Sequence, residues 1–297
     1  VSTGAFAAAA LTTTCAAAIN GMLAASPPNR AAIDTIRIGA STGNGSINLQ
    51  GIGWQEHSRS RGIVTFTFDD GFVSQYDAAK ILAERGMAAT MYAIPTSELS
   101  SPGDYVTAAQ MRELRDLYGW DIEAHNYGGI STLSEAEVRE LFDATLTWFH
   151  DNGLGTPRHY AYPGGNHSET ARRVVQEFFA SARGTTDAAG GLEPTTPGMA
   201  DLLRVAEHPV SDAQVAWVKS RMDAAAAGGL WCVLALHKVT AGAPTDAAME
   251  ISQAALAECA DRRIAHNESF DARIIRIALH RHYNAEDADG WAQRSEE

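Results

Sequence analysis

The sequence predicts an α/β fold over residues 61–297, a distorted (β/α) barrel with about seven parallel strands. Two observations lead to this prediction. From residue 62 onward, short apolar runs alternate with helical patterns, which is typical of parallel strands joined by crossover helices. Residues with reactive side chains follow several of these apolar runs, and strand ends are where such folds gather their chemistry.

The expected strands are short and mostly apolar. They lie at Ile63–Phe68, Ala89–Ile94, Trp120–Ala124, His159–Tyr162, Ala180–Arg183, Leu202–Ala206 and Leu230–Leu236. Helical patterns separate them at residues 74–86, 107–118, 135–152, 168–179, 212–227 and 246–262. Ser134 and Glu137 have the spacing of a capping box, and Ser211-Asp212 and Thr245-Asp246 are typical helix starts.

Residues 1–60 have a different, β-rich pattern. The turn-like run Ser41–Ser46 separates two apolar alternations, Ile36–Gly39 and Ile47–Trp54, which predicts a β-hairpin. The pattern resembles the last strands of a concanavalin-like jelly roll. About 60 residues cannot close a whole sandwich, so we expect this segment to be the end of a longer chain.

Composition excludes several classes of partner. With 23 basic and 36 acidic residues, the net charge is −13, which argues against nucleic acid or an anionic membrane as the main partner. Cys15, Cys232 and Cys259 lie far apart, so the sequence contains neither a disulfide framework nor a CxxC metal motif. No basic residue precedes the Ala-rich stretch 5–25 and polar residues interrupt it, which favours neither a signal peptide nor a membrane span.

Asp69 and Asp70 close the first apolar strand, and Gly71 permits a tight turn after them. Two adjacent carboxylates raise each other's pKa unless a cation compensates. This pattern favours a site that combines a metal ion with a general base. The alternative is a turn in which an Asp caps the helix that begins near Ser74.

Three further strand ends carry candidate residues. His125 follows the strand that ends at Ala124, and His237 follows the apolar run Leu230–Leu236. Gly164, within Pro163–Gly165, leaves backbone N–H groups open to a substrate. The structural alternatives are a buried or capping histidine and an ordinary strand-ending turn.

In this order, the four motifs resemble the polysaccharide deacetylase family, carbohydrate esterase family four, whose catalytic unit is the NodB homology domain. The resemblance covers about residues 62–240, and its most specific part is Thr67-Phe-Asp-Asp-Gly71. Leu234-Ala-Leu-His237 is similar to the family's late motif, and Ala161-Tyr-Pro-Gly-Gly165 to its third. Arg183 stands where related sequences also carry a basic residue at a strand end.

The resemblance implies a role for each residue. Asp69 would be the general base, His237 the general acid, and Gly164 the backbone N–H donor to the oxyanion. Asp70 and His125 would bind a divalent metal, which in the family is usually zinc. Substrate contacts are expected from Tyr127, Tyr162 and Arg183.

The sequence departs from the family pattern at two positions. The family's second motif has His at i and i+4, and here the i+4 position is Gly129. A catalytic zinc ordinarily has three protein ligands, so the third ligand is open, with His159, His167, His208 and Asn126 as candidates. Ala161 stands where many members carry an Arg that pairs with the base, and Arg158, Arg183 or Arg204 could replace that Arg.

The resulting functional hypothesis is a hydrolase that removes acetyl groups from a polysaccharide or oligosaccharide, with an acetylated, neutral glycan as its partner. A catalytically degenerate, carbohydrate-binding member is the first alternative. A metal-independent esterase or amidase ranks last. We expect an extracellular, cell-surface or virion-associated location, and the oligomeric state stays open.

Overall fold

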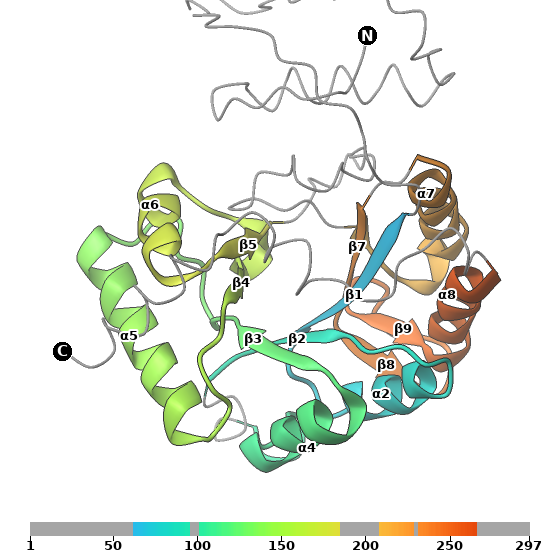
Figure 1. Ribbon diagram of the computed structural model, residues 1–297, viewed down its shortest axis with the longest axis horizontal. Helices are drawn as coiled ribbons and strands as arrows, with labels where there is room; N and C mark the ends of the chain where they lie inside the picture. Colours follow the sequence, from blue (N-terminus) through green and yellow to red (C-terminus); the bar gives the residue numbers. More distant parts are fainter. Residues whose placement is uncertain (1–61, 96–100, 185–207, 229–230, 266–297) are drawn as a thin grey trace, which may run out of the picture.

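A computed structural model describes residues 62–95, 101–184, 208–228 and 231–265 of this chain. The described residues contain a seven-stranded sheet in the order β5-β4-β3-β2-β1-β7-β6, and every pairing in it is parallel. The sheet curls, and the helices lie around its outer side (Figure 1). The prediction of a distorted barrel of parallel strands is confirmed. The expected hairpin in residues 1–60 and the expected strand Leu202–Ala206 lie outside the described residues.

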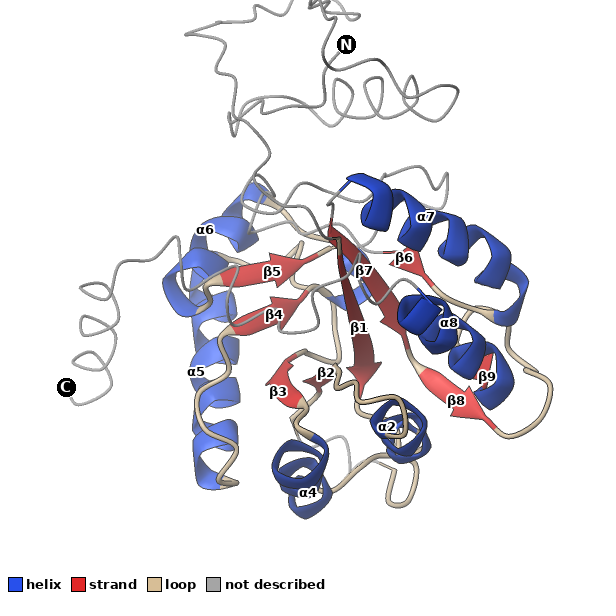
Figure 2. Cartoon of the chain, turned by 45° about the vertical axis from the view of Figure 1, so that its right-hand side comes forward, coloured by secondary structure: helices blue, strands red, loops and turns tan. Residues whose placement is uncertain are grey.

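The strands of this sheet are short. Their bounds are β1 Ile63–Asp70, β2 Thr90–Ala93, β3 Asp121–Ala124, β4 His159–Ala161, β5 Ser181–Arg183, β6 His208–Pro209 and β7 Trp231–Leu236. The helices are α2 Gln75–Ala83, α4 Ala108–Tyr118, α5 Glu135–Asp151, α6 Glu169–Phe178, α7 Val215–Gly228 and α8 Gln253–Ala265. In Figure 2 the helices surround the strands, as the crossover connections of parallel strands require.

The two faces of the sheet differ in chemistry because successive side chains of a strand point to opposite faces. On β1, Phe66 and Phe68 belong to the large apolar core that also includes the buried residues of the surrounding helices. Thr65, Thr67 and Asp69 alternate with them and are also buried. The inner face of β1 is therefore polar, and its last inward-facing residue is Asp69.

One expected helix begins later than the sequence pattern indicates. The pattern predicts a helix over residues 246–262, but α8 begins at Gln253, after strand β9 (Glu250–Ser252). Strand β9 pairs with β8 (Lys238–Thr240) in a separate two-stranded sheet. The Glu250 carboxylate accepts hydrogen bonds from the backbone N–H groups of Thr245 and Asp246, at 2.7 and 3.1 Å. These bonds stabilise a turn where the sequence pattern predicts a helix start.

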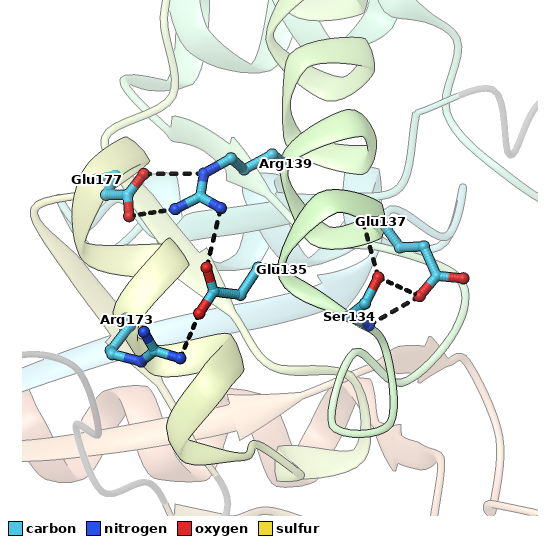
Figure 3. A network of polar contacts seen from close by, with 6 residues as sticks. All are labelled: Ser134, Glu135, Glu137, Arg139, Arg173 and Glu177. Atoms are coloured by element: carbon cyan, nitrogen blue, oxygen red, sulfur yellow. Dashed lines mark hydrogen bonds and ion pairs between the residues drawn. The ribbon is translucent and has the colours of Figure 1, made fainter.

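Helix α5 begins with the expected capping box (Figure 3). The Ser134 hydroxyl oxygen accepts from the Glu137 N–H at 3.3 Å, and the Glu137 carboxylate accepts from the Ser134 N–H at 2.8 Å. These reciprocal bonds satisfy two backbone donors that a helix start otherwise leaves unpaired.

Charged side chains join α5 to α6 on the surface. Arg139 lies 2.7 Å from a Glu177 carboxylate oxygen and 3.3 Å from Glu135, which also pairs with Arg173 (Figure 3). These side chains are well exposed, so water and salt screen each pair and its contribution to stability is small. The buried sheet, and not this network, therefore supplies most of the energy that holds α5 in place.

Within the described residues, no helix is both long and apolar enough to span a membrane.

Ser134→Ala tests the capping box. We expect a loss of about 1 kcal/mol in the free energy of unfolding, because the substitution leaves the Glu137 N–H without its acceptor. Chemical denaturation measures this loss. Ser220→Ala in α7 is the matched control and should be close to neutral, because Ala is the better former of a helix interior. Equal losses in both variants would contradict the role of the cap.

Candidate functional site

The site is built on the carboxyl end of β1, where Asp69 and Asp70 follow one another. Asp70 has φ +70, the only positive φ of a non-glycine residue in the described part of the chain, and Gly71 continues the turn with φ +79. Asp tolerates this left-handed region better than most residues, at some cost in backbone strain. Strain of this kind is concentrated at functional sites, which is consistent with a chemical role for this strand end.

Asp69 forms a buried ion pair with Arg183, the last residue of β5. The Arg183 side chain is 3% exposed, and its guanidinium carbon lies 5.0 Å from the ring centroid of Tyr92, where cation–π attraction adds to the pair. Arg183 therefore stabilises the negative charge of Asp69. The expectation that Arg183 also contacts substrate stays a prediction.

Three positive groups act on Asp69. Burial by itself raises the pKa of Asp69, but the charges of Arg183, His125 and His237, together with the Arg183 hydrogen bond, outweigh burial and lower it. Asp69 is consequently ionised at neutral pH. The interaction with His237 also places that histidine, which follows β7, within electrostatic range of Asp69.

His125 lies directly after β3 and is 4% exposed. Its Nδ1 is 2.7 Å from the carbonyl oxygen of Ala161. Because a carbonyl only accepts, Nδ1 carries the proton and donates, which leaves Nε2 directed toward Asp70 Oδ1 at 3.5 Å. Burial acts to lower the pKa of His125, but the hydrogen bond with Asp70 and the charges of Asp69 and Asp70 raise it overall.

Asp70 and His125 fit a metal ion as two of its ligands. A backbone carbonyl that holds Nδ1–H and leaves Nε2 free is the usual support of a metal-bound histidine. Two ligand atoms about 2.1 Å from one tetrahedral ion lie about 3.4 Å apart, close to the separation of Asp70 Oδ1 and His125 Nε2. Within the described ranges, no group of three His, Cys, Asp or Glu side chains could hold an ion.

Three candidates for a third ligand, His159, Asn126 and His167, lie in the described residues. His159 Nδ1 is 2.8 Å from the Ser181 hydroxyl, and burial lowers the pKa of His159 to about 4. Asn126 donates its amide nitrogen to the Thr145 hydroxyl at 3.2 Å, and its Oδ1 is buried without a hydrogen-bond partner among the described residues. The His167 ring packs 4.9 Å from the Tyr162 ring. The His208 side chain and Arg204 lie outside the described residues. At Gly129, a Cβ would meet no heavy atom within 4 Å.

Ala161 stands where the family pattern has an arginine beside the base, and Arg183 takes the place of that arginine. In the parallel pairing of β4 and β5, Ala161 is the register partner of Arg183. The guanidinium therefore comes from the neighbouring strand, and the small Ala161 side chain occupies the position next to it. The backbone of the same turn is tied to Arg183, whose carbonyl accepts from the Tyr162 N–H at 2.9 Å.

The turn that holds Gly164 follows β4. Residues Pro163–Gly165 form one 3₁₀ turn in which Gly164 has φ +58, a conformation that favours glycine. Asn166 donates its side-chain amide to the Gly164 carbonyl at 3.2 Å and closes the turn. Gly164 therefore lies at the same carboxyl edge of the sheet as His125 and Arg183.

Of the aromatic residues at the site, Tyr162 lies in the core, whereas Tyr127 and Tyr105 form what we call the rim of the site. Tyr162 is 2% exposed and packs edge-on against Tyr160, which makes it part of the core, and its expected contact with substrate stays a prediction. Tyr127 is 82% exposed. Burial, then Asp70, then Tyr127 raise the pKa of Tyr105, so Tyr105 lies within electrostatic range of both residues. Sequence patterns gave no indication of Tyr105, which an antiparallel bridge holds beside Phe72.

Gln75 is a second residue that the sequence does not single out. It is completely buried at the start of α2, and its side-chain nitrogen donates to the carbonyl oxygens of Asp69 and His237, at 2.6 and 3.0 Å. A glutamine at the start of a helix has no sequence signal that separates it from a surface residue. Only the tertiary contact identifies it.

Comparison with known proteins agrees with the resemblance seen in the sequence. Residues 56–180 match the family model described as polysaccharide deacetylase. A search of curated proteins finds no match. The resemblance to the polysaccharide deacetylase family is confirmed over the matched residues.

Several solved structures are similar to this chain at low sequence identity. A putative polysaccharide deacetylase from Mycobacterium smegmatis has a TM-score of 0.53 at 15% identity, over 77% of this chain and 92% of that one. A family 4 carbohydrate esterase from Streptomyces lividans in complex with acetate has a TM-score of 0.46 at 19% identity, over 72% and 93%. A family 4 acetyl xylan esterase from Clostridium thermocellum in complex with a cobalt ion has a TM-score of 0.43 at 19% identity, over 70% and 87%.

Arg183→Met tests the ion pair. Removing one partner leaves the Asp69 charge buried, so we expect the free energy of unfolding to fall by about 3–5 kcal/mol at pH 7. The lowered pKa means that ionised Asp69 stabilises the wild type above pH 4, and this contribution is lost as pH falls through the folded-state pKa. In the variant, burial acts on Asp69 without the guanidinium, so protonation of Asp69 at lower pH removes the unpaired buried charge. Denaturation of the variant should therefore show a free energy of unfolding that recovers as the pH falls toward 4.

The double variant Asp69→Asn/Arg183→Met is the control for that experiment. It removes both charges, so it should be more stable than Arg183→Met alone at pH 7. A double variant with the summed loss of both single variants would show that the two side chains act independently.

Proposed function

We propose that this protein is a carbohydrate deacetylase that removes acetyl groups from a neutral polysaccharide or oligosaccharide. The observation that carries the proposal is the convergence of an ionised, buried Asp69 with Arg183, His125 and His237 at one edge of the sheet. Acyl hydrolysis needs a base for water, an acid for the leaving group and donors for the oxyanion. These strand ends supply a candidate for each.

Asp69 is the general base in this proposal. Its carboxylate is held ionised by Arg183, so it can accept the proton of the attacking water at neutral pH. Arg183 also restricts the direction of the carboxylate, because Tyr92 packs against the guanidinium from the other side. Asp70, its neighbour in sequence, is directed to His125 instead.

His237 is the general acid. It follows β7 and is half-buried, so a substrate can reach it. Its proton passes to the departing amine or alcohol as the acyl carbon–heteroatom bond breaks, and the proton taken by Asp69 balances that step. The Gly164 N–H is proposed to stabilise the oxyanion, a kind of contact whose loss typically costs ~2.7–4 kcal/mol of the barrier.

Asp70 and His125 would hold a divalent metal, and zinc is the ion we propose. When bound, such an ion polarises the acetyl carbonyl and lowers the pKa of water. The Nδ1–H donation to Ala161 keeps the His125 Nε2 directed toward Asp70, so the two ligands are oriented before the ion arrives.

The rim suits a sugar. Tyr127 exposes most of its ring and lies within electrostatic range of Tyr105, which in turn lies in range of Asp70. Aromatic faces at this position can stack on a pyranose ring while the acetyl group reaches the carboxylates. The net charge of −13 disfavours polyanionic glycans, so chitooligosaccharide and acetylated xylan are the substrates to test.

One observation favours a second function. With Gly129 in place of a histidine, no group of three His, Cys, Asp or Glu side chains in the described residues could hold an ion. A member of this kind could bind glycans without turning them over. Zinc content of the purified protein, measured beside acetate release from both substrates, separates the two functions. Metal-free protein with full activity would instead favour the metal-independent esterase or amidase.

Asp69→Asn and His237→Ala test the acid–base assignment. Each should lower kcat for acetate release by ~10²–10⁴-fold while the circular dichroism spectrum is unchanged. Asp143→Asn and His150→Gln remove the same residue types from exposed positions on α5 and should leave kcat unaltered. Wild-type turnover in either site variant would show that another residue acts as the base or the acid.

Gly129→His tests the metal site. A third imidazole should tighten zinc binding at least about tenfold in a calorimetric titration, since a three-ligand site binds more strongly than a two-ligand site. Gly128→His is the matched control, because a Cβ at either glycine meets no heavy atom within 4 Å. The control should bind zinc as the wild type does. Equal affinity in all three proteins would exclude position 129 from the site.

A further inference from the structure

Gln75 joins the two strands that carry the proposed base and acid. Its amide nitrogen donates to the Asp69 carbonyl at 2.6 Å and to the His237 carbonyl at 3.0 Å. Asp69 ends β1 and His237 follows β7, and these residues are 168 positions apart in the chain. One side chain therefore bonds to the backbones of both residues that the proposed reaction requires to move protons.

The orientation of this amide is determined by its partners. Both are carbonyl oxygens, which only accept, so the NH₂ group must face them. The other amide atom, Oε1, is buried and has no hydrogen-bond partner among the described residues. An apolar side chain of similar size would not bury an oxygen without a partner, so the two donated bonds are what the glutamine adds at this position.

These bonds act where the regular sheet ends. The register of β1 and β7 runs from Ile63 with Trp231 to Phe68 with Leu236 and stops immediately before Asp69 and His237. Beyond it, the Ser74 hydroxyl accepts from the Val239 N–H at 3.1 Å. The Asp69 carbonyl also belongs to the peptide that precedes the positive-φ residue Asp70, so the Gln75 bond holds that peptide in place.

We propose that Gln75 is a positioning residue that sets the separation and direction of Asp69 and His237. The inference rests on the proposed function, because it assumes that these two residues are the base and the acid. A hydrogen bond to a residue's carbonyl restricts the peptide plane and hence the direction of its side chain. Proton transfer is sensitive to such geometry, and displacement by about 1 Å can cost 10²-fold in rate.

Gln75→Met removes both donors and keeps the length of the side chain. We expect kcat for acetate release to fall about 10- to 100-fold while KM changes less than about twofold, because the change displaces the reacting groups and not the rim. Thr65→Val is the matched control. It removes the buried bond from Trp231 Nε1 to the Thr65 hydroxyl, at 3.0 Å, which also joins β1 to β7. It should leave kcat within about twofold.

A double variant separates positioning from a general loss of structure. In the His237→Ala background, Gln75→Met should lower kcat only a few-fold, since the acid that it helps to position is already gone. If kcat of the double variant falls by the product of the two single-variant factors, the proposal is overturned. Should Gln75→Met fail to fold, Gln75→Leu gives the same test, since its side chain has no donor for either carbonyl.

The outcomes distinguish this proposal from the one on which it rests. A wild-type protein that releases no acetate from chitooligosaccharide or acetylated xylan overturns the proposed function and the role of Gln75 with it. An active wild type, together with a folded Gln75→Met variant of unchanged kcat, overturns the role of Gln75 alone.

Discussion

The ion pair between Asp69 and Arg183 is the constraint on which the geometry of this site depends. Asp69 is on β1 and Arg183 on β5, four strands away in the sheet order. In a flat sheet, strands four positions apart are about 19 Å from one another. Direct contact between these side chains therefore requires the sheet to curl, and the inner side of that curl is where the candidate residues meet. The Tyr92 ring, on β2 between them, packs against the guanidinium.

The same pair accounts for two adjacent carboxylates at one strand end. Each has its own positive or proton-donating partner, Arg183 for Asp69 and His125 for Asp70. The positive φ of Asp70 turns the chain after the buried residue, so that neighbouring side chains reach different partners. This division separates a candidate base from a candidate metal ligand and limits the repulsion that two like charges would otherwise impose.

Rigid and adaptable parts of the site lie on different kinds of structure. Asp69, His125, Arg183 and His237 lie at strand ends, and a buried glutamine ties two of those ends together. Tyr127 is exposed on a loop after β3. Catalysis of acyl transfer requires the strand-end residues to be held closely, whereas recognition of a glycan tolerates variation in the position of the loop residue. The proposed deacetylase is consistent with this arrangement.

The sequence by itself determined the alternation of strands and helices, the capping box at Ser134 and the strand ends that carry Asp69, Asp70, His125 and His237. Hydrophobic periodicity and local motifs carry that information, because they depend on residues near one another in the chain. Only the tertiary structure decided that Arg183 pairs with Asp69, that Tyr162 is a core residue and that Gln75 bonds to Asp69 and His237. Those contacts join residues far apart in the sequence, and their geometry depends on strand register and sheet curl, which no local pattern encodes.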